Sequence, residues 1–398
     1  MNENIFFKKE WRGQNIRILA VDDPAVGLYQ NGHHVTDQWE KITGMKVAFE
    51  PIQWSEYPAK VFSMLQSGSD AYDSVMVPGF FWLPKFASSK WVAPLDPLID
   101  SIKEAWQAYQ IEDVHPHLRI ELSYLDKKYL IPSFSEVQIV YYRKDLIRDA
   151  GLETPKNPIS INDYIMIAEK LHHPPDYYGT HIKGGTAESF PEWLPFFSSF
   201  GGDLFDGVQS PSFNNVAGIK SLQIMKALVN YCGPNVEQGD NATVLSLLKS
   251  GKVGIVNHWS GQLIPAMRER ENGINEDYGF TFLENPWGSI WAFALNSASK
   301  KQIQTLSYLL YATCKENDIR QADYSGSPVR LSTLANPTLQ FKYPWFDSLS
   351  GALDQKSSFP SFERFADIVG NLYLMVNDVL SGKKEISEAL LQAENTCK

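Results

Sequence analysis

The sequence predicts an α/β protein of two lobes, and three observations lead to this fold class. Strand and helix patterns alternate from Asn15 to Gly79, which is typical of a parallel sheet covered by helices. The chain has 398 residues, enough for two or more domains. No Pro-, Gly- or Ser-rich linker divides it, so we expect the chain to cross between the lobes through packed segments.

The first elements follow from apolar runs and from helix stop signals. A helix is expected to end at Gly44, and a second one to begin at Ser55 and stop at Gly68. Short apolar runs predict strands at 15–23, 45–54 and 72–79. Their β-α-β-α-β order predicts parallel strands that are covered on both faces.

The middle of the chain begins with the apolar run VQIVYY, which predicts a strand followed by a very short helix. Asp145 is expected to cap this helix and Gly151 to end it in a left-handed turn. A longer helix should follow Ser160, which stands three residues before Asp163 as in a capping box. Further helices are expected at 214–233, 300–314, 362–382 and up to about 394, with strands within 247–261, 278–284 and 289–296.

Composition and charge exclude several classes of partner. The net charge is −10 and no dense basic run occurs, so we expect no nucleic-acid partner. The three cysteines are widely spaced and form no metal box. No run of 18 apolar residues predicts a membrane span. The N-terminus does not have the pattern of a signal peptide, so the protein is either cytoplasmic or has lost a targeting segment.

Motifs of known enzyme classes are missing from the sequence. It contains no GxSxG, no HExxH and no P-loop, so we predict no catalytic residues and no cofactor. His115 and His117 are two residues apart, but no further metal ligands follow them, and we predict no metal site. Paired carboxylates for glycoside hydrolysis stay open, because their separation is a three-dimensional property.

Five stretches in a fixed order carry a resemblance to a known family. They are PSFSEVQIVYYRKDLIRDAGLETP (132–155), FGGDLFD (200–206), LLKSGKVGIVNHWSG (247–261), WAFALNSASKKQIQTLSYLLYAT (291–313) and YSGSPVRLSTLANP (324–337). Together they resemble the family-1 extracellular solute-binding proteins, the maltose-binding-protein-like sugar receptors of ABC importers. Each stretch is weak alone, and the shared order over nearly the whole chain makes the resemblance specific.

The resemblance implies a type II periplasmic-binding-protein fold with discontinuous lobes, hinge segments and an interlobe cleft. It places 12–135 and 288–328 in the N-terminal lobe, and 136–287 and 329–398 in the C-terminal lobe. Ser133–Gln138 is then a hinge strand, with later crossings near Pro286–Ile290 and Ser327–Leu331. Hinge closure around a ligand is a known property of periplasmic binding proteins.

The function that the resemblance implies is that of a non-catalytic receptor. It would bind a sugar or oligosaccharide between its lobes and deliver it to the permease subunits of an ABC importer. We expect a monomer that is periplasmic or extracellular, with a lipid anchor as one form of attachment. The alternatives are a carbohydrate-active hydrolase, or a receptor of the same fold for a polyol, a peptide or a cationic solute.

Aromatic side chains are the first candidates for ligand contact, because sugar rings present apolar C–H faces. Trp259 leads the set, since it stands at a strand end where the family commonly places a sugar-facing ring. For every other ring, packing in the core is the alternative interpretation. The remaining aromatic candidates are Phe81, Trp82, Trp193, Trp287 and Trp291.

Polar side chains are needed to hydrogen-bond the sugar hydroxyls. The resemblance gives Glu136, in the hinge segment, the role of a ligand-binding carboxylate. Asp22 and Asp23 end the first strand, and the carboxyl ends of strands face the cleft in open α/β sheets. Their alternative role is to cap the next helix. His258 and Arg330 complete the candidates, and Arg330 has a structural role as its alternative.

Overall fold

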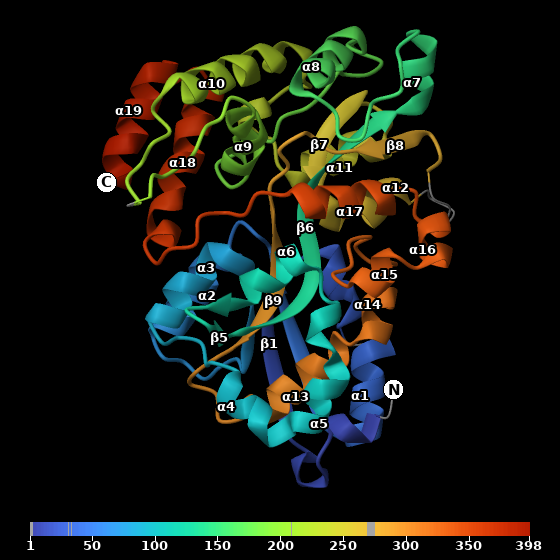
Figure 1. Ribbon diagram of the computed structural model, residues 1–398, viewed down its shortest axis with the longest axis vertical. Coiled ribbons are helices and arrows are strands. Elements are labelled where there is room, and N and C mark those ends of the chain that lie inside the picture. Colours follow the sequence, from blue (N-terminus) through green and yellow to red (C-terminus); the bar gives the residue numbers. More distant parts are fainter. Residues whose placement is uncertain (1–2, 31, 33, 208, 269–274) are drawn as a thin grey trace. The chain divides into compact units, whose positions relative to one another are not determined.

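The computed structural model describes residues 3–398 except 31, 33, 208 and 269–274. The chain forms two compact units, each assembled from separate stretches of sequence (Figure 1). Unit 1 and unit 2 are interleaved in sequence, so the chain passes between them at Glu136–Val137 and again at Gly288–Ser289. Unit 1 consists of Met1–Glu136, Ser289–Leu339 and Ser361–Glu363, and unit 2 consists of Val137–Gly288, Gln340–Pro360 and Arg364–Lys398.

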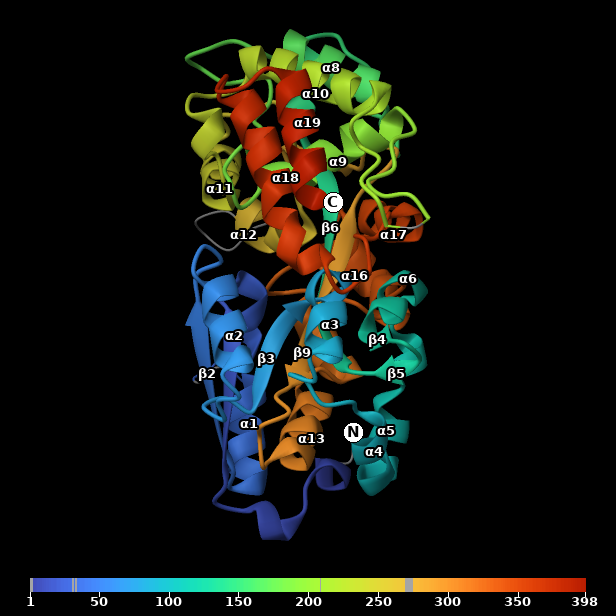
Figure 2. The ribbon, with the colours of Figure 1, turned by 90° about the vertical axis from the view of Figure 1, so that its left-hand side faces the viewer.

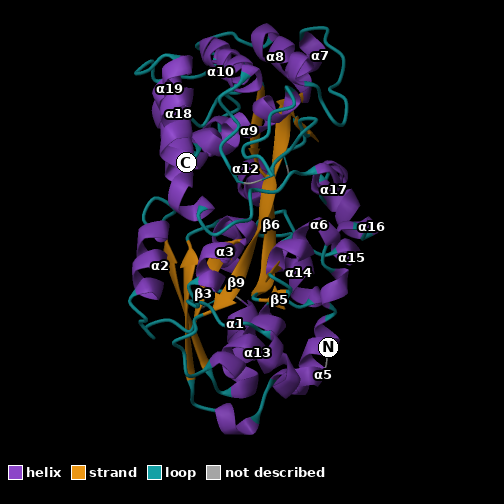
Figure 3. Ribbon diagram, turned by 60° about the vertical axis from the view of Figure 1, so that its left-hand side comes forward, coloured by secondary structure: helices purple, strands orange, loops and turns teal. Residues whose placement is uncertain are grey.

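Unit 1 is built on a mixed sheet with the strand order β2-β1-β3-β9-β6. β1 runs parallel to β2 and to β3, as the sequence predicts, whereas β9 runs antiparallel to β3. All residues of β3 and β9 are buried, as expected for strands with helices on both faces (Figure 3). The bounds are β1 Asn15–Val21, β2 Lys46–Ile52, β3 Ser74–Pro78, β6 Leu130–Arg143 and β9 Gly288–Leu295, with a small hairpin of β4 Ser123–Tyr124 and β5 Lys127–Lys128.

The helices of unit 1 match the predicted ones where the apolar pattern is clear. The helix expected at 55–68 is α2, although Glu56 rather than Ser55 is its N-cap residue. The helix expected at 300–314 is α13. The bounds are α1 His34–Thr43, α2 Tyr57–Gln66, α3 Gly79–Ser88, α4 Asp96–Ile99, α5 Lys103–Tyr109, α6 Pro116–Arg119, α13 Gln302–Ala312, α14 Lys315–Gln321, α15 Leu331–Leu334 and α16 Pro337–Lys342, the last of which runs into unit 2.

Unit 2 has the second half of β6 as its central strand. β7 and β8 pair with it in antiparallel fashion. Helices α10, α18 and α19 pack against one another at one end of the unit (Figure 2). The bounds are β7 Ile255–Trp259, β8 Tyr278–Thr281, α7 Lys144–Asp149, α8 Ile161–Lys170, α9 Ser189–Ser199, α10 Val216–Leu228, α11 Asn241–Lys249, α12 Leu263–Met267, α17 Phe346–Gln355, α18 Phe365–Leu380 and α19 Ile386–Cys397.

The predicted helix caps of unit 2 are partly confirmed. Ser160 caps α8, because its hydroxyl accepts a 3.1 Å hydrogen bond from the backbone N–H of Asp163. Gly151 follows α7 with φ +67°, the left-handed turn that the sequence predicts. The prediction for Asp145 is wrong: it lies inside α7 and binds the Arg143 guanidinium, with 2.7 Å between Oδ1 and Nε.

The largest difference from the predicted lobe boundaries concerns residues 329–339, while Glu136, Gly288 and Ser361–Glu363 also fall in the other unit than predicted. Residues 329–339 pack with unit 1, whereas the prediction assigned all residues from 329 onward to the C-terminal lobe. The cause is the polar cluster around Arg330 described below, which fixes this stretch to α14 and to residues after α5. Among the helices of the described residues, none combines the length and apolar character needed to cross a bilayer.

Candidate functional site

The carboxyl ends of β1, β2 and β3 meet at one edge of the unit 1 sheet, since these strands are parallel. Asp22 follows β1 directly; its backbone N–H donates to Ile52 O over 2.7 Å, and its exposed carboxylate accepts a hydrogen bond from the Gln53 amide. Asp23 has the alternative role that the sequence allows, because its Oδ1 caps the next turn by accepting from Ala25 N over 2.8 Å. Asp22 is therefore the better placed of the two to bind a ligand.

An aromatic cluster lies at the same edge of unit 1. Trp82 of α3 and Trp291 of β9, both predicted site residues, are joined here by Trp54, which follows β2. The rings of Trp54 and Trp82 stack with centroids 5.7 Å apart, and the Trp54 ring meets the Trp291 ring edge-on, also at 5.7 Å. Trp54 is half-buried, whereas Trp82 and Trp291 are buried. Within this cluster Trp54 is the half-buried ring, and Trp82 stacks against it.

Phe81 and Glu136 are two further predicted residues that lie in unit 1. Phe81 is buried in α3, next to Trp82 in sequence. Glu136 is half-buried and is the last residue of unit 1 before β6 enters unit 2. The predicted lobes place Glu136 at the start of the C-terminal lobe, one residue away from the boundary found here.

Trp259 is the last residue of β7 and pairs with Gln138 of β6 in unit 2. Its indole Nε1 donates to Glu188 Oε2 over 3.3 Å, and Glu188 Oε1 accepts from Asn241 Nδ2 over 2.8 Å. The ammonium of Lys183 lies 4.9 Å from the centroid of the Trp259 ring, within cation–π range. Two charged side chains thus fix the orientation of the Trp259 ring.

Lys183 is itself held by a second carboxylate. Its Nζ lies 2.9 Å from Glu192 Oε1, and both side chains are almost completely buried. Breaking such a pair would leave an uncompensated buried charge, which typically costs about 3–5 kcal/mol. The Lys183 ammonium is therefore a fixed support below Trp259 rather than a mobile surface charge.

Burial dominates the electrostatics of this cluster. It raises the pKa of Glu188 to about 7, although Lys183 and the Trp259 N–H act in the opposite direction. It also raises the pKa of Glu192, again against the effect of Lys183. The pKa of His258 falls well below its usual range, because burial and the nearby Lys183 both disfavour the charged imidazolium. The pKa of about 7 places the titration of Glu188 near neutral pH.

A pocket of about 530 Å³ in unit 2 has Glu188 in its lining. Its lining includes Glu188 at the start of α9 and Asp240 just before α11. Glu188 lines this pocket and also bonds Trp259, so one carboxylate joins the two features. The lining residues are Gly185, Thr186, Ala187, Glu188, Glu237, Gln238, Asp240, Asn377 and Lys383.

Trp259 is buried, with 8% of its surface exposed, and the remaining predicted residues of unit 2 are buried as well. His258 is fully buried below Trp259, with its Nδ1 3.4 Å from Lys183 Nζ. Trp193 is fully buried in α9, stacks on Phe197 with centroids 4.4 Å apart, and donates from Nε1 to Ser221 Oγ over 2.7 Å. Trp287 donates from Nε1 to Ser198 Oγ over 3.0 Å. These contacts give Trp193 a core position and give Trp287 a position against α9.

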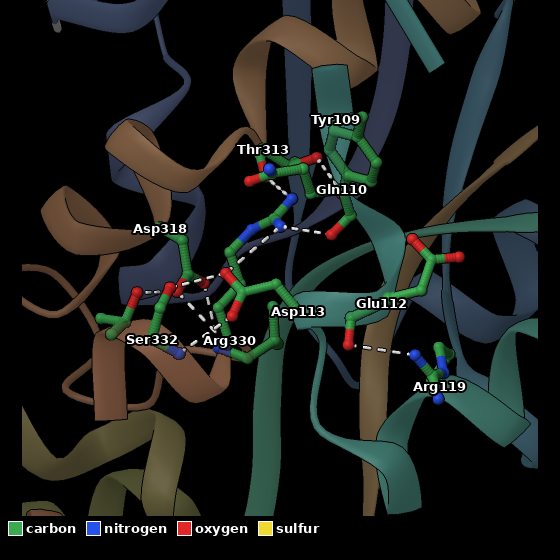
Figure 4. Close-up of polar contacts among 11 residues, drawn as sticks. Tyr109, Gln110, Glu112, Asp113, Arg119, Thr313, Asp318, Arg330 and Ser332 are labelled. Carbon is green, nitrogen blue, oxygen red and sulfur yellow. Dashed lines mark hydrogen bonds and ion pairs between the residues drawn. The ribbon is translucent and has the colours of Figure 1, made fainter. Parts of the chain in front are cut away.

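Arg330 lies in a buried polar cluster of unit 1 (Figure 4). Its guanidinium donates to Gln110 O over 3.0 Å and to Thr313 O over 3.3 Å, and its Cζ lies 4.6 Å from the centroid of the Tyr109 ring. Asp318 accepts from the backbone N–H of Arg330 over 3.3 Å. The guanidinium is occupied by contacts within unit 1, so we leave Arg330 out of the candidate site.

Sequence reasoning missed Glu188, Lys183 and Trp54. Glu188 immediately precedes the aromatic stretch SFPEWLPFF, and an acidic residue ahead of an aromatic helix was the available signal. Trp54 stands one residue after Gln53 at the end of β2, in the same kind of position that singled out Asp22. Lys183 left no signal in the sequence, because its partners Glu192 and Trp259 are distant or on other elements. In the described part of the chain, no group of three or more His, Cys, Asp or Glu side chains could hold a metal ion.

Comparison with known proteins places this geometry in a family. A solute-binding protein from Agrobacterium radiobacter K84 in complex with ribitol has the same fold, with a TM-score of 0.85, 20% identity and coverage of 96% of this chain and 98% of the other. A probable amino-acid ABC transporter periplasmic-binding protein of Sinorhizobium fredii is 22% identical over 388 residues, 96% of this chain and 88% of the relative. A mannitol-binding protein of Pseudomonas aeruginosa is 24% identical over 322 residues, 72% of each chain.

The family model described as bacterial extracellular solute-binding protein matches residues 34–312. This stretch includes all strands of both units after β1, together with Trp259, Glu188 and the aromatic cluster of unit 1. The fold is the two-lobed α/β fold that the sequence predicts. With more than half of its residues covered by the model and its fold shared with a ligand-bound relative, the chain belongs to the bacterial extracellular solute-binding proteins.

Proposed function

We propose that this chain is the receptor subunit of an ABC importer and that its ligand is a small polyhydroxylated solute, a polyol or a sugar. The observation that carries the proposal is the family match over residues 34–312. The mannitol-binding relative and the ribitol-bound structure support this class of ligand. The receptor passes its ligand to transmembrane permease subunits, carries out no catalysis, and acts outside the cytoplasm as a monomer with or without a lipid anchor.

The chemistry of the candidate residues fits such a ligand. The half-buried face of Trp54 and the fixed ring of Trp259 suit C–H groups, and the carboxylates of Asp22 and Glu188 suit hydroxyl donors. We propose Trp54 and Asp22 in unit 1, and Trp259 and Glu188 in unit 2, as ligand contacts. Glu136 stays in the proposed set because of its place in the crossing strand.

An amino acid is the second candidate ligand, because one relative is a probable amino-acid transporter component. An amino acid carries a carboxylate that needs a cationic or N–H partner. Lys183, the cation beside Trp259, is already paired with Glu192 at 2.9 Å. Because this cation is already paired, the candidate site favours a neutral hydroxylated solute over the carboxylate of an amino acid.

A thermal-shift panel tests the proposal. It contains ribitol, D-mannitol, monosaccharides, maltose and amino acids, each with the same protein and buffer. A ligand present at 100 times its Kd stabilises the folded protein by about 2.7 kcal/mol, which shifts the melting temperature measurably. We expect a polyol or sugar to give the shift and to be recovered unchanged. Stabilisation by amino acids alone would overturn the ligand class, and release of hydrolysis products from glycans would overturn the non-catalytic role.

A further inference from the structure

Gln138 ties two stretches of chain together within unit 2. It is the second residue after the crossing at Glu136–Val137, and Trp287 is the second residue before the crossing at Gly288–Ser289. The backbone N–H of Gln138 donates to Trp287 O over 3.0 Å, and the side-chain Oε1 of Gln138 accepts from Trp287 N over 3.1 Å. The two crossing segments are therefore bonded to each other at the point where they enter unit 2.

The other half of the Gln138 amide reaches helix α9. Its Nε2 donates to Pro191 O over 2.7 Å, and the whole side chain is buried with 1% exposed. In an uninterrupted helix, Pro191 O would accept from the N–H of residue 195, four positions later. Residue 195 is a proline and has no N–H, so the helix leaves this carbonyl without a partner. The Gln138 amide supplies the missing donor.

Gln138 uses both halves of its side-chain amide. Its amide donates through Nε2 and accepts through Oε1 at once, toward Pro191 and Trp287. An ionised carboxylate of the same shape accepts only, and methionine does neither effectively. Helix α9 begins next to Glu188, the carboxylate that holds the Trp259 ring. One amide thus connects both crossing segments to the element beside the candidate site.

We propose that Gln138 is a positioning residue that couples the crossing segments to α9, and through α9 to the Glu188–Trp259 pair. Movement of the crossing segments then shifts the start of α9, and binding at Trp259 in turn restricts the crossing segments. The proposal rests on the proposed function in one respect, because it takes Trp259 and Glu188 as ligand contacts. In this proposal, the Gln138 side chain affects ligand affinity from the crossing segment without contacting the ligand itself.

The first test uses Gln138→Glu and D-mannitol as the probe, with Kd measured by calorimetry near pH 8 and near pH 5. The ionised carboxylate cannot donate to Pro191 O, so we expect a Kd at least about tenfold above that of wild type near pH 8. Near pH 5 the buried carboxyl is protonated, its O–H donates again, and the ratio of the two Kd values should fall toward one. A ratio of one at both pH values, or an equal ratio above one at both, overturns the proposal.

The matched control is Asn296→Asp in unit 1. Asn296 is also buried, and its Nδ2 donates to Ser69 O and Tyr72 O, both over 2.8 Å. The chemical change is the same as in Gln138→Glu, but it lies in the loop after β9. We expect a lower melting temperature and no pH-dependent change in the Kd ratio. The same pH-dependent ratio in this control would show that any buried carboxylate produces the effect, and would overturn the assignment to Gln138.

A second pair of variants separates a positioning role from a purely structural one. In Gln138→Met the carbonyl of Pro191 has no donor, which should lower the melting temperature. Adding Pro195→Ala restores the N–H of residue 195 and hence an internal partner for that carbonyl. We expect the melting temperature to recover in the double variant while the raised Kd for D-mannitol remains. Recovery of both would mean that Gln138 only satisfies a carbonyl, and would overturn the proposal.

A readout without ligand keeps the two proposals distinguishable. Spin labels on Glu104→Cys and Lys226→Cys, at exposed positions of α5 and α10, report the distance between the units, since the three native cysteines are buried. We expect Gln138→Met to broaden the distance distribution of the ligand-free protein relative to wild type. An unchanged distribution overturns the coupling even if D-mannitol binds. If D-mannitol does not bind wild type, this distribution decides the role of Gln138, and the thermal-shift panel decides the ligand class.

Discussion

Glu188→Gln should remove a large part of the pH dependence of folding stability. The substitution preserves the shape of the side chain and removes its charge. Glu188 is 6% exposed, and burial raises its pKa from the ordinary 4.5 to about 7, while Lys183 and the Trp259 N–H lower it. The native state therefore holds a proton that the unfolded state has already released over this range of pH.

The sign and size of the effect follow from this difference. A folded-state pKa above the unfolded value gives stability that is fully present below the unfolded pKa and is lost as pH rises. For wild type the loss accumulates between 4.5 and about 7, and at about 1.4 kcal/mol per pH unit it amounts to about 3 kcal/mol. In Glu188→Gln this loss is absent. The neutral amide has one acceptor oxygen for the donors Asn241 and Trp259, which costs about 1–3 kcal/mol at every pH and does not change the slope.

Urea unfolding followed by circular dichroism, at several pH values between about 4.5 and about 8, measures this difference. We expect the free energy of unfolding of wild type to fall by about 3 kcal/mol more than that of Glu188→Gln across the range. Glu153→Gln, which changes an exposed carboxylate of the same unit, should behave as wild type does. Parallel curves of unfolding free energy against pH for wild type and Glu188→Gln would refute the reasoning, because they would show that the Glu188 carboxyl has the same pKa in the folded and the unfolded state.

Three further predictions concern the ligand, the lobes and the Arg330 cluster. Trp259→Ala should raise the ligand Kd about thirtyfold, equivalent to about 2 kcal/mol, whereas Trp193→Ala should destabilise the fold by about 3–5 kcal/mol and leave the Kd of the folded protein unchanged. Calorimetry and melting curves of both variants check this. Equal affinities for Trp259→Ala and wild type would count against the proposed contact. Ligand should reduce the radius of gyration in small-angle scattering, as hinge closure predicts, and an unchanged radius with a bound ligand would speak against closure. Arg330→Met removes the guanidinium that pairs with Asp113 Oδ2 over 3.7 Å and that acts electrostatically on the buried Asp318. The loss should cost about 3–5 kcal/mol in chemical unfolding at unchanged Kd, whereas a shift in Kd with intact stability would place Arg330 at the ligand.

The sequence predicted the parts of the fold that depend on short-range patterns. The apolar runs of β1 and β3 identified buried parallel strands, and the end of β1 identified Asp22 at the edge of the sheet. Ser160 and Gly151 were predictable because a cap and a left-handed turn need particular residue types at particular positions. The antiparallel direction of β9 was not predicted, because it depends on the path of the chain through unit 2.

Local sequence patterns were not sufficient to identify the residues of the candidate site. Trp193 and Trp259 look alike in sequence, since each ring stands beside polar residues. Only the packing separates them: Trp193 is stacked on Phe197 in the core, and Trp259 stands over Lys183. Glu188 bonds a ring that lies 71 residues later, and no spacing rule predicts such a pair. Long-range pairing of charged and aromatic groups is therefore the information that the fold adds.

The interleaving of the two units has a consequence for the order in which the protein can fold during synthesis. β3 pairs with β9, and the side chain of Ser74 bonds the carbonyl of Ala294, 220 residues later. All of unit 2 between Val137 and Gly288 must leave the ribosome before this partner exists. Until then β3 is an unpaired apolar edge, the kind of surface that associates with other chains. The nascent N-terminal half must therefore either delay its collapse or be bound by a chaperone until β9 is synthesised. Insertions in unit 2 would lengthen the time during which β3 is exposed, although they would not change the residues of β3 or β9.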